Sequence, residues 1–146
     1  MKASESLVSR LRQGLPDILA DEPVAAAYLY GSSVTGLTTP FSDVDVGLVV
    51  GREIDPLPRL KLMLRVQLAL EDRCGIRNAD VRVIDDAPIV FRGRVVTEGI
   101  LVYSRDEEAR VEFETTTRMR YFDYLPIHNE LRDQFFRRIR ERGLHG

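Results

Sequence analysis

The stretch that decides the fold is Leu29–Val49, which reads LYGSSVTGLTTPFSDVDVGLV. Apolar runs at its two ends belong to strands that we predict over 24–30 and 42–50. The Gly-, Ser- and Thr-rich residues 31–39 between them form a connection that is too short for a parallel crossover. We therefore expect these two strands to pair antiparallel within a mixed sheet.

The rest of the chain alternates predicted helices with predicted strands. Apolar residues at helical or alternating spacing predict helices at 5–20, 60–70 and 90–99, and strands at 80–84 and 100–103. From Asp106 onward the charge pattern is helical, with an interruption at Pro126. This order predicts an α/β (α+β) fold, in which helices cover one mixed central sheet within residues 1–105. The C-terminal helical extension, 106–146, is expected to belong to the same compact unit.

Composition narrows the class of protein. The 146 residues are 44% hydrophobic and 30% charged, which is typical of one globular domain. A formal net charge of −2 provides no general electrostatic attraction to nucleic acid, so we expect no nucleic-acid partner for this chain alone. One cysteine, Cys74, and two histidines, His128 and His145, exclude a metal site built from cysteines or histidines. With no apolar run near the ~20 residues of a membrane span and no signal core, we expect a soluble cytoplasmic protein.

The polar turn after the first strand has the features of an anion site. Residues 31–38 nearly spell a phosphate-binding P-loop, but Leu37 stands where that loop needs its lysine, so a P-loop NTPase is not supported. What remains is a strand that runs into Gly31-Ser32 and a helical turn, whose free N–H groups and hydroxyl suit a phosphate. The same pattern also fits an N-capped turn without a ligand.

Three aspartates are candidate metal ligands. Asp43 and Asp45 are two residues apart on a predicted strand, so their carboxylates point to the same face. A fold tolerates such a pair best when a cation lies between the charges, and Mg²⁺ typically takes one or two carboxylates. Asp80 opens the third strand and joins the pair if the two strands are neighbours. Each aspartate can alternatively be a solvated strand end or a local turn cap.

Together these residues form a pattern with a known counterpart. Ten residues separate Ser32 from Asp43, and the spacing Gly-Ser-x10-Asp-x-Asp, with Asp80 on a later strand, resembles the nucleotidyltransferases of the DNA polymerase β superfamily. Among these the chain is most similar to the minimal nucleotidyltransferases, the MNT proteins encoded beside HEPN-domain partners. The resemblance covers roughly residues 5 to 105 and implies a polymerase β-like nucleotidyltransferase fold.

The resemblance implies a role for each matched residue. The nucleotide would be bound by Gly31, Ser32 and Ser42, and the two catalytic Mg²⁺ ions by Asp43, Asp45 and Asp80. Asp80 would also activate the attacking hydroxyl. Such a two-metal mechanism needs carboxylates and no histidine or cysteine, which agrees with the composition.

The same resemblance implies that the chain transfers AMP from ATP to a tyrosine hydroxyl of its HEPN-domain toxin, as the antitoxin of a toxin–antitoxin pair. Two alternatives stay open. A non-catalytic antitoxin would neutralise the toxin by direct binding, and a nucleotidyltransferase of the aminoglycoside type would modify a small molecule. The small-molecule acceptor is less favoured, because those enzymes usually carry a larger C-terminal helical domain.

Two positions depart from the family pattern. Ser33-Val34-Thr35 is neutral where many relatives carry an arginine, so one triphosphate contact is missing or comes from elsewhere. Arg82 shares the predicted face of Asp80, where an apolar residue would be expected. Arg82 is therefore a candidate nucleotide ligand, and its alternative role is to pair with Asp80 in competition with metal.

The C-terminal extension is rich in aromatic side chains. Six of the eleven aromatic residues of the chain lie between Phe113 and Phe136. Leu125, Leu131, Phe135 and Ile139 add an apolar stripe at helical spacing. This surface either packs on the core of the domain itself or forms an interface with a protein partner.

Overall fold

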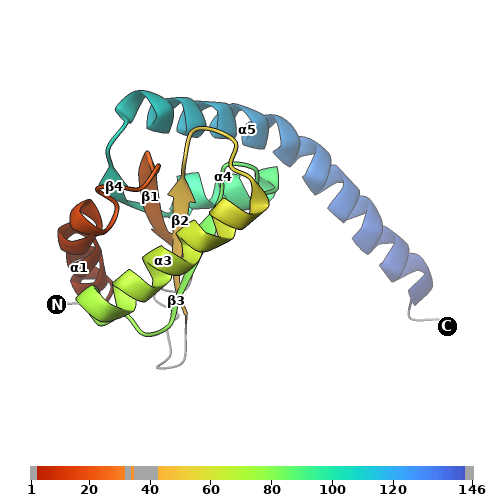
Figure 1. The fold of residues 1–146 in the computed structure, drawn as a ribbon. Coiled ribbons are helices and arrows are strands. Elements are labelled where there is room, and N and C mark those ends of the chain that lie inside the picture. The colour runs from red at the N-terminus through yellow and green to blue at the C-terminus, as the bar shows by residue number, and fades with distance from the viewer. Residues whose placement is uncertain (1–2, 32–33, 35–42, 144–146) are drawn as a thin grey trace.

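The computed structural model of the chain describes residues 3–31, 34 and 43–143, and Figure 1 traces their path. The elements, in chain order, are α1 (Ala3–Ile18), β1 (Ala26–Tyr30), β2 (Val44–Val49), α3 (Pro56–Cys74), β3 (Ala79–Val83), α4 (Ile89–Glu98), β4 (Ile100–Ser104), α5 (Glu107–Arg138) and a closing π-helical turn, η1 (Ile139–Gly143). This is the predicted order of helices and strands. Along the described part of the chain, no helix combines the length and the apolar character needed to span a lipid bilayer.

The four strands form one mixed sheet in the order β3-β2-β1-β4. β1 lies antiparallel to β2 and to β4, whereas β2 and β3 are parallel. The predicted α/β fold, with its mixed sheet and its antiparallel first pair, is thereby confirmed. Because β1 is antiparallel to β2 and β2 is parallel to β3, the end of β1 meets the starts of β2 and β3 at one end of the sheet.

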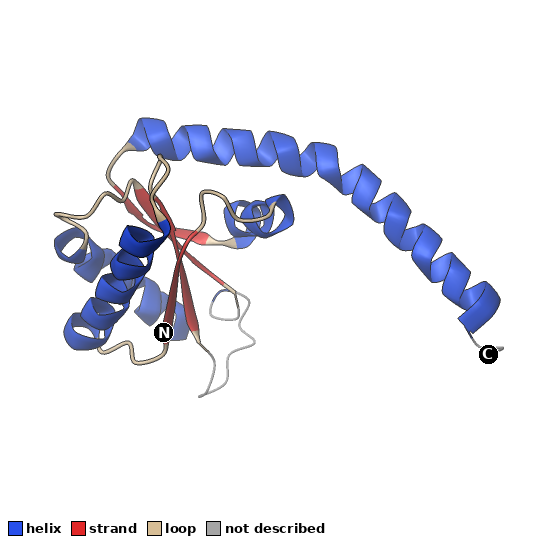
Figure 2. Cartoon of the chain, turned by 45° about the vertical axis from the view of Figure 1, so that its right-hand side comes forward, coloured by secondary structure: helices blue, strands red, loops and turns tan. Residues whose placement is uncertain are grey.

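Helices cover both faces of the sheet (Figure 2). α1 and α3 pack on one face, where Leu11, Leu29 and Leu62 belong to the larger core cluster. α4 and the first turns of α5 cover the other face, where the rings of Tyr28 and Phe113 are 6.4 Å apart. The two clusters place apolar side chains on both sides of the central strands, which explains why β1 is apolar along its whole length.

α3 is longer than the predicted helix at 60–70. Apolar periodicity marks only its buried part, whereas the helix begins at Pro56, a residue that suits a first helical turn because its missing N–H needs no partner there. Its end is set by Gly75, which adopts a left-handed φ of 67°. The N–H groups of Gly75 and Ile76 donate to the carbonyls of Glu71 and Leu70, so the last turn is closed.

The predicted interruption at Pro126 is wrong, because α5 runs through this residue as one helix. A proline removes one backbone hydrogen bond, and an exposed helix can accommodate this by bending and by solvating the freed carbonyl. Figure 1 shows α5 curving away from the rest of the molecule. Within α5, whose residues are all described, Thr117 is the one buried residue, Tyr121 still packs on α4, and the helix beyond Tyr121 projects from the domain.

Gly93→Ala is expected to loosen the attachment of α5 to α4. The ring of Tyr121 occupies the position where a Cβ of residue 93 would lie. The substitution should therefore lower the free energy of unfolding by roughly 1–3 kcal/mol, despite the better helix propensity of alanine. Urea denaturation followed by circular dichroism measures this change. In a Tyr121→Ala background the penalty should largely vanish, and an undiminished penalty there would contradict the contact as its cause.

Candidate active site

Three acidic residues and one tyrosine lie at the end of the sheet where β1 ends and where β2 and β3 begin. The strand register places Asp45 opposite Asp80 in the parallel pair and opposite Tyr30 in the antiparallel pair. Residues directly opposite one another on neighbouring strands point to the same face of a sheet. The structure therefore brings Asp80 beside Asp45, and Asp43 immediately precedes β2.

Gly31 lies against the carboxylate of Asp45. Its φ of +79° is in the left-handed region, and a Cβ at this position would overlap Oδ2 of Asp45. The carbonyl of Gly31 accepts a hydrogen bond from the N–H of Val34 at 3.1 Å, which begins a turn. Ser32 and Ser42 lie outside the described residues, so their roles stay predictions.

Negative charge is concentrated at this end of the sheet. Burial raises the pKa of Asp45 above its ordinary value, and the nearby charges of Asp80 and Asp43 raise it further. Burial, followed by the charge of Asp45, raises the pKa of Tyr30 to about 12. A bound cation would relieve this repulsion, because opposite charge favours the ionised form of a carboxyl group.

Tyr30 is a member of the site that sequence analysis did not single out. Its ring packs edge-on against Phe91 of α4, with centroids 5.3 Å apart. Its hydroxyl is buried and has no hydrogen-bond partner within the described ranges. The only signal in the sequence is its position directly before Gly31, and the register with Asp45 that makes this position informative is a property of the folded sheet.

Arg82 supplies positive charge to the same cluster. Its Nε and Nη2 atoms donate to Oδ2 of Asp80 over 3.2 and 3.1 Å. The hydrogen bond to Asp80 and the charge of that carboxylate raise the pKa of Arg82. Of the two roles considered for Arg82, the structure shows the pairing with Asp80, and the contact with a nucleotide stays a prediction.

The donor set fits a hard divalent cation in part. Asp43 is exposed and Asp45 is half-buried beside Gly31, and carboxylate oxygens are ligands that suit Mg²⁺. The third carboxylate, Asp80, is engaged by Arg82. Within residues 3–31, 34 and 43–143, no three acidic, histidine or cysteine side chains are gathered closely enough to hold a metal. Asp43 and Asp45 are thus the available ligands, and Asp80 joins them only after Arg82 moves.

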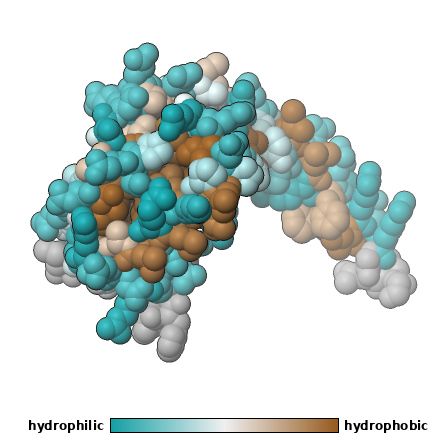
Figure 3. All heavy atoms as spheres, viewed as in Figure 1, coloured by the Kyte–Doolittle hydropathy of each residue, from teal (hydrophilic) through white to brown (hydrophobic). Residues whose placement is uncertain are grey.

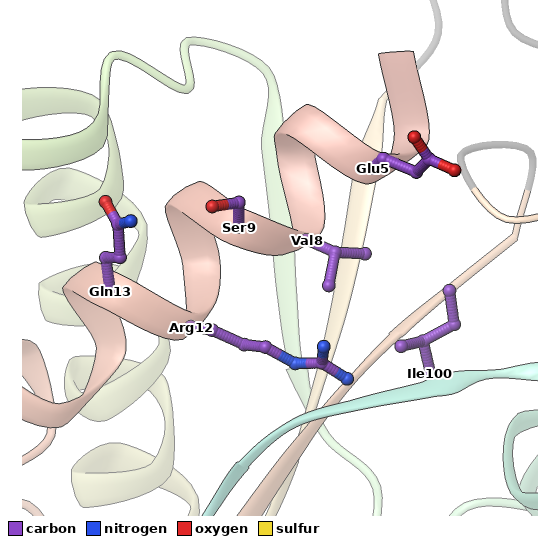
Figure 4. A pocket seen from close by; sticks show the side chains of 6 residues that line it. All are labelled: Glu5, Val8, Ser9, Arg12, Gln13 and Ile100. Atoms are coloured by element: carbon purple, nitrogen blue, oxygen red, sulfur yellow. The ribbon is translucent and has the colours of Figure 1, made fainter. Parts of the chain in front are cut away.

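A separate hollow lies on the opposite face of the sheet. Figure 4 shows it between α1 and the start of β4, where it is lined by Glu5, Val8, Ser9, Arg12, Gln13 and Ile100. Arg12 crosses it and donates from Nη2 to the carbonyl of Leu101 at 3.0 Å. Val8 and Ile100 pack against the core under α1 and α3, whereas Tyr30 packs against the core under α4. The sheet therefore separates this hollow from Asp45.

Asp45→Asn is expected to stabilise the metal-free protein at neutral pH. Since the pKa of Asp45 is raised by folding, the folded protein keeps this proton to a higher pH than the unfolded chain. The free energy of unfolding therefore falls as the pH rises through that interval. Removing the charge should recover up to about 1 kcal/mol at pH 7, and the gain should shrink toward about pH 4.

Urea unfolding in EDTA at a series of pH values measures the effect of Asp45→Asn. Asp43→Asn is the matched control, because Asp43 is exposed and should change the stability little. An Asp45→Asn variant that is less stable than the native protein at pH 7 would contradict the repulsion inferred for this cluster.

The fold is similar to solved structures of MNT antitoxins in complex with HEPN toxins. One match is a chain of the complex of a tri-AMPylated Shewanella oneidensis HEPN toxin with its MNT antitoxin, with a TM-score of 0.63 and 18% identity, covering 88% of this chain and 98% of that one. A chain of the MntA–HepT toxin–antitoxin complex gives 0.62 and 19%, covering 86% and 97%. A chain of a toxin–antitoxin complex with AMP-PNP gives 0.61 and 20%, covering 92% and 99%.

No curated protein sequence matches the chain, but one protein-family model does. The family described as "Polymerase beta, Nucleotidyltransferase" matches residues 13–108, a segment that includes Gly31, Asp43, Asp45 and Asp80. This match spans well over half of the chain and the whole sheet, and the protein therefore belongs to the polymerase β nucleotidyltransferase family.

Proposed function

We propose that this protein is a Mg²⁺-dependent adenylyltransferase that moves AMP from ATP to a tyrosine hydroxyl of a HEPN-domain toxin, and so acts as the antitoxin in the cytoplasm. The observation that carries the proposal is the alignment of Asp45 with Asp80 beside Gly31, within a nucleotidyltransferase domain. The structural relatives support the choice of acceptor and nucleotide, since one was solved with a tri-AMPylated HEPN toxin and another with AMP-PNP.

Different residues at this end of the sheet are proposed to bind the nucleotide and the metal ions. The left-handed turn at Gly31, which carries no side chain, brings the backbone close to Asp45, and Gly31, Ser32 and Ser42 are proposed to make the contacts to the nucleotide. Asp43 and Asp45 would hold two Mg²⁺ ions. The chemistry that these ions supply when bound is stabilisation of the charge on the entering and leaving oxygens at the α-phosphate.

The transfer itself is a direct displacement. The tyrosine oxygen forms a bond to the α-phosphorus, the bond from that phosphorus to the bridging oxygen breaks, and pyrophosphate leaves. Asp80 would accept the proton of the hydroxyl, which requires that Arg82 first release this carboxylate. The freed guanidinium of Arg82 can then pair with a phosphate, because both groups match in charge and geometry.

Neutralisation by binding alone is the second candidate function. The observation that favours it is the Arg82–Asp80 ion pair, which engages the third carboxylate of the cluster. In this case the protein would protect against its toxin through contact surface, and the acidic cluster would have no catalytic part.

The double variant Asp43→Asn/Asp45→Asn separates these two functions. Asparagine keeps the shape of aspartate but removes the charges that would hold Mg²⁺. Loss of a group that only supports a metal ligand lowers activity by up to ~100-fold. Because this variant removes two ligands themselves, the transfer rate should fall by more than that, while the complex with the toxin persists. Intact mass spectrometry of the HEPN partner, co-expressed with each form, should show added AMP units with the native chain alone.

The other outcomes of this experiment are equally informative. A partner that stays unmodified but co-purifies with both forms would overturn the enzymatic proposal in favour of binding alone. A partner that is neither modified nor bound would direct the search to a small-molecule acceptor.

Arg82→Leu is expected to tighten the binding of Mg²⁺ by about 3- to 10-fold, because it removes a competing cation and frees Asp80 in a partly solvated site. Isothermal titration calorimetry with Mg²⁺ alone measures this change. Arg77→Leu is the matched control, since it removes the same charge from an exposed position three residues before Asp80. Equal gains in the two variants, or a loss of affinity in Arg82→Leu, would contradict the competition.

A further inference from the structure

The distal part of α5 together with η1, residues 122–142, forms an exposed arm with an apolar stripe. Ile127, Leu131, Phe135 and Ile139 follow one another at four-residue spacing, which places them along one side of the helix. Except for the partly buried Leu125, the phenylalanine, leucine and isoleucine side chains of this arm are between 42% and 61% exposed. Figure 3 shows hydrophobic residues at several places along the arm, away from the rest of the domain. Exposed apolar residues that gather on one side of a helix are typical of a protein–protein interface.

The tip of the arm is basic. Five of the seven charged residues between 132 and 142 are arginines. A hollow at the tip combines both properties, since it is lined by Asp133, Phe136, Arg137, Ile139 and Arg140. A complementary partner therefore presents an apolar surface that is bordered by carboxylates. Two copies of this arm side by side in parallel would instead bring two basic tips together, which like-charge repulsion disfavours.

The base of the same helix is fastened to the face of the sheet that carries the active site. The hydroxyl of Tyr28 donates to Glu114 of α5 at 2.6 Å, and the ring of Tyr121 packs over Gly93 of α4. Tyr30, which faces Asp45, packs against the same helix α4. In Figures 1 and 2 the arm leaves the domain at the end of the sheet remote from the active site, and its tip returns to the level where β2 and β3 begin. A protein seated inside this curve would face the acidic cluster.

We propose that the arm is the docking surface for the acceptor protein, whose contact region is apolar and flanked by acidic side chains. This inference rests on the proposed function, because it assigns to one surface the task of presenting the acceptor hydroxyl to Asp45 and Asp80. The arm acts as a positioning element and takes no part in the displacement.

Leu131→Asp and Phe135→Asp test the proposal in the full-length protein. Both side chains are exposed, so the fold should survive, and circular dichroism checks this. Each variant should weaken binding of the HEPN partner at least ~30-fold, as expected for a residue at the centre of an interface. Leu68→Asp is the matched control. Leu68 is 64% exposed, and it belongs to α3, the helix that covers the other face of the sheet. Its substitution should change binding no more than about twofold.

Three readouts keep the failure of this inference apart from failure of the proposed function. Calorimetry measures partner binding, thermal shift measures binding of Mg²⁺ with AMP-PNP, and mass spectrometry measures AMP transfer over a range of partner concentrations. The arm variants should keep nucleotide binding and should recover the native transfer rate at high partner concentration, which means a raised KM with an unchanged kcat.

The outcomes that overturn the inference are distinct. Arm variants that bind the partner as tightly as the native protein would refute docking on the arm, while continued AMP transfer would leave the proposed function standing. Native protein that binds the partner through the arm but transfers no AMP would refute the proposed function and keep the docking surface. A native dimer by light scattering that becomes monomeric in the arm variants, with partner binding unchanged, would assign the arm to a second copy of the chain.

Discussion

Where β1 ends, the backbone of Gly31 passes directly against the carboxylate of Asp45. Two requirements coincide at this glycine, since its φ is +79° and a Cβ would occupy the space of the carboxylate oxygen. β1 and β2 are paired in register beside this contact, and the parallel register of β2 with β3 places Asp45 against Asp80. The site consequently depends on one close approach between backbone and side chain.

That arrangement has an electrostatic cost, and Arg82 offsets part of it. Asp43, Asp45 and Asp80 gather negative charge beside a half-buried tyrosine, and burial together with the charges of Asp80 and Asp43 raises the pKa of Asp45. Sites that are organised for a ligand often hold such unfavourable charge in its absence. Because the stabilising ion pair of Arg82 uses Asp80, the interaction that supports the metal-free fold also opposes completion of a metal site.

α5 serves the domain in two different ways along its length. Near its base, Phe113 and Tyr121 pack against the sheet and α4, which corresponds to the interpretation of the aromatic extension as core. Beyond Tyr121 the helix leaves the domain, and most of its large apolar residues are exposed, as expected for an interface. The core interpretation therefore applies to the base of the helix, and the interface interpretation stays a proposal for its distal part. The packing of the base fixes the orientation of the arm relative to the sheet, because α5 continues as one helix through Pro126.

By itself the sequence determined the order of helices and strands, the antiparallel first pair and the Gly-Ser-x10-Asp-x-Asp spacing, because periodicity and motif spacing depend only on near neighbours in the chain. Asp80 was a candidate on the same grounds. Only the tertiary structure decided that Asp80 stands in register with Asp45, that Tyr30 faces them and that Arg82 is bound to Asp80. It also decided that α5 continues through Pro126. Strand register and side-chain pairing join residues far apart in the chain, and a helix break depends on whether solvent can replace the lost hydrogen bond.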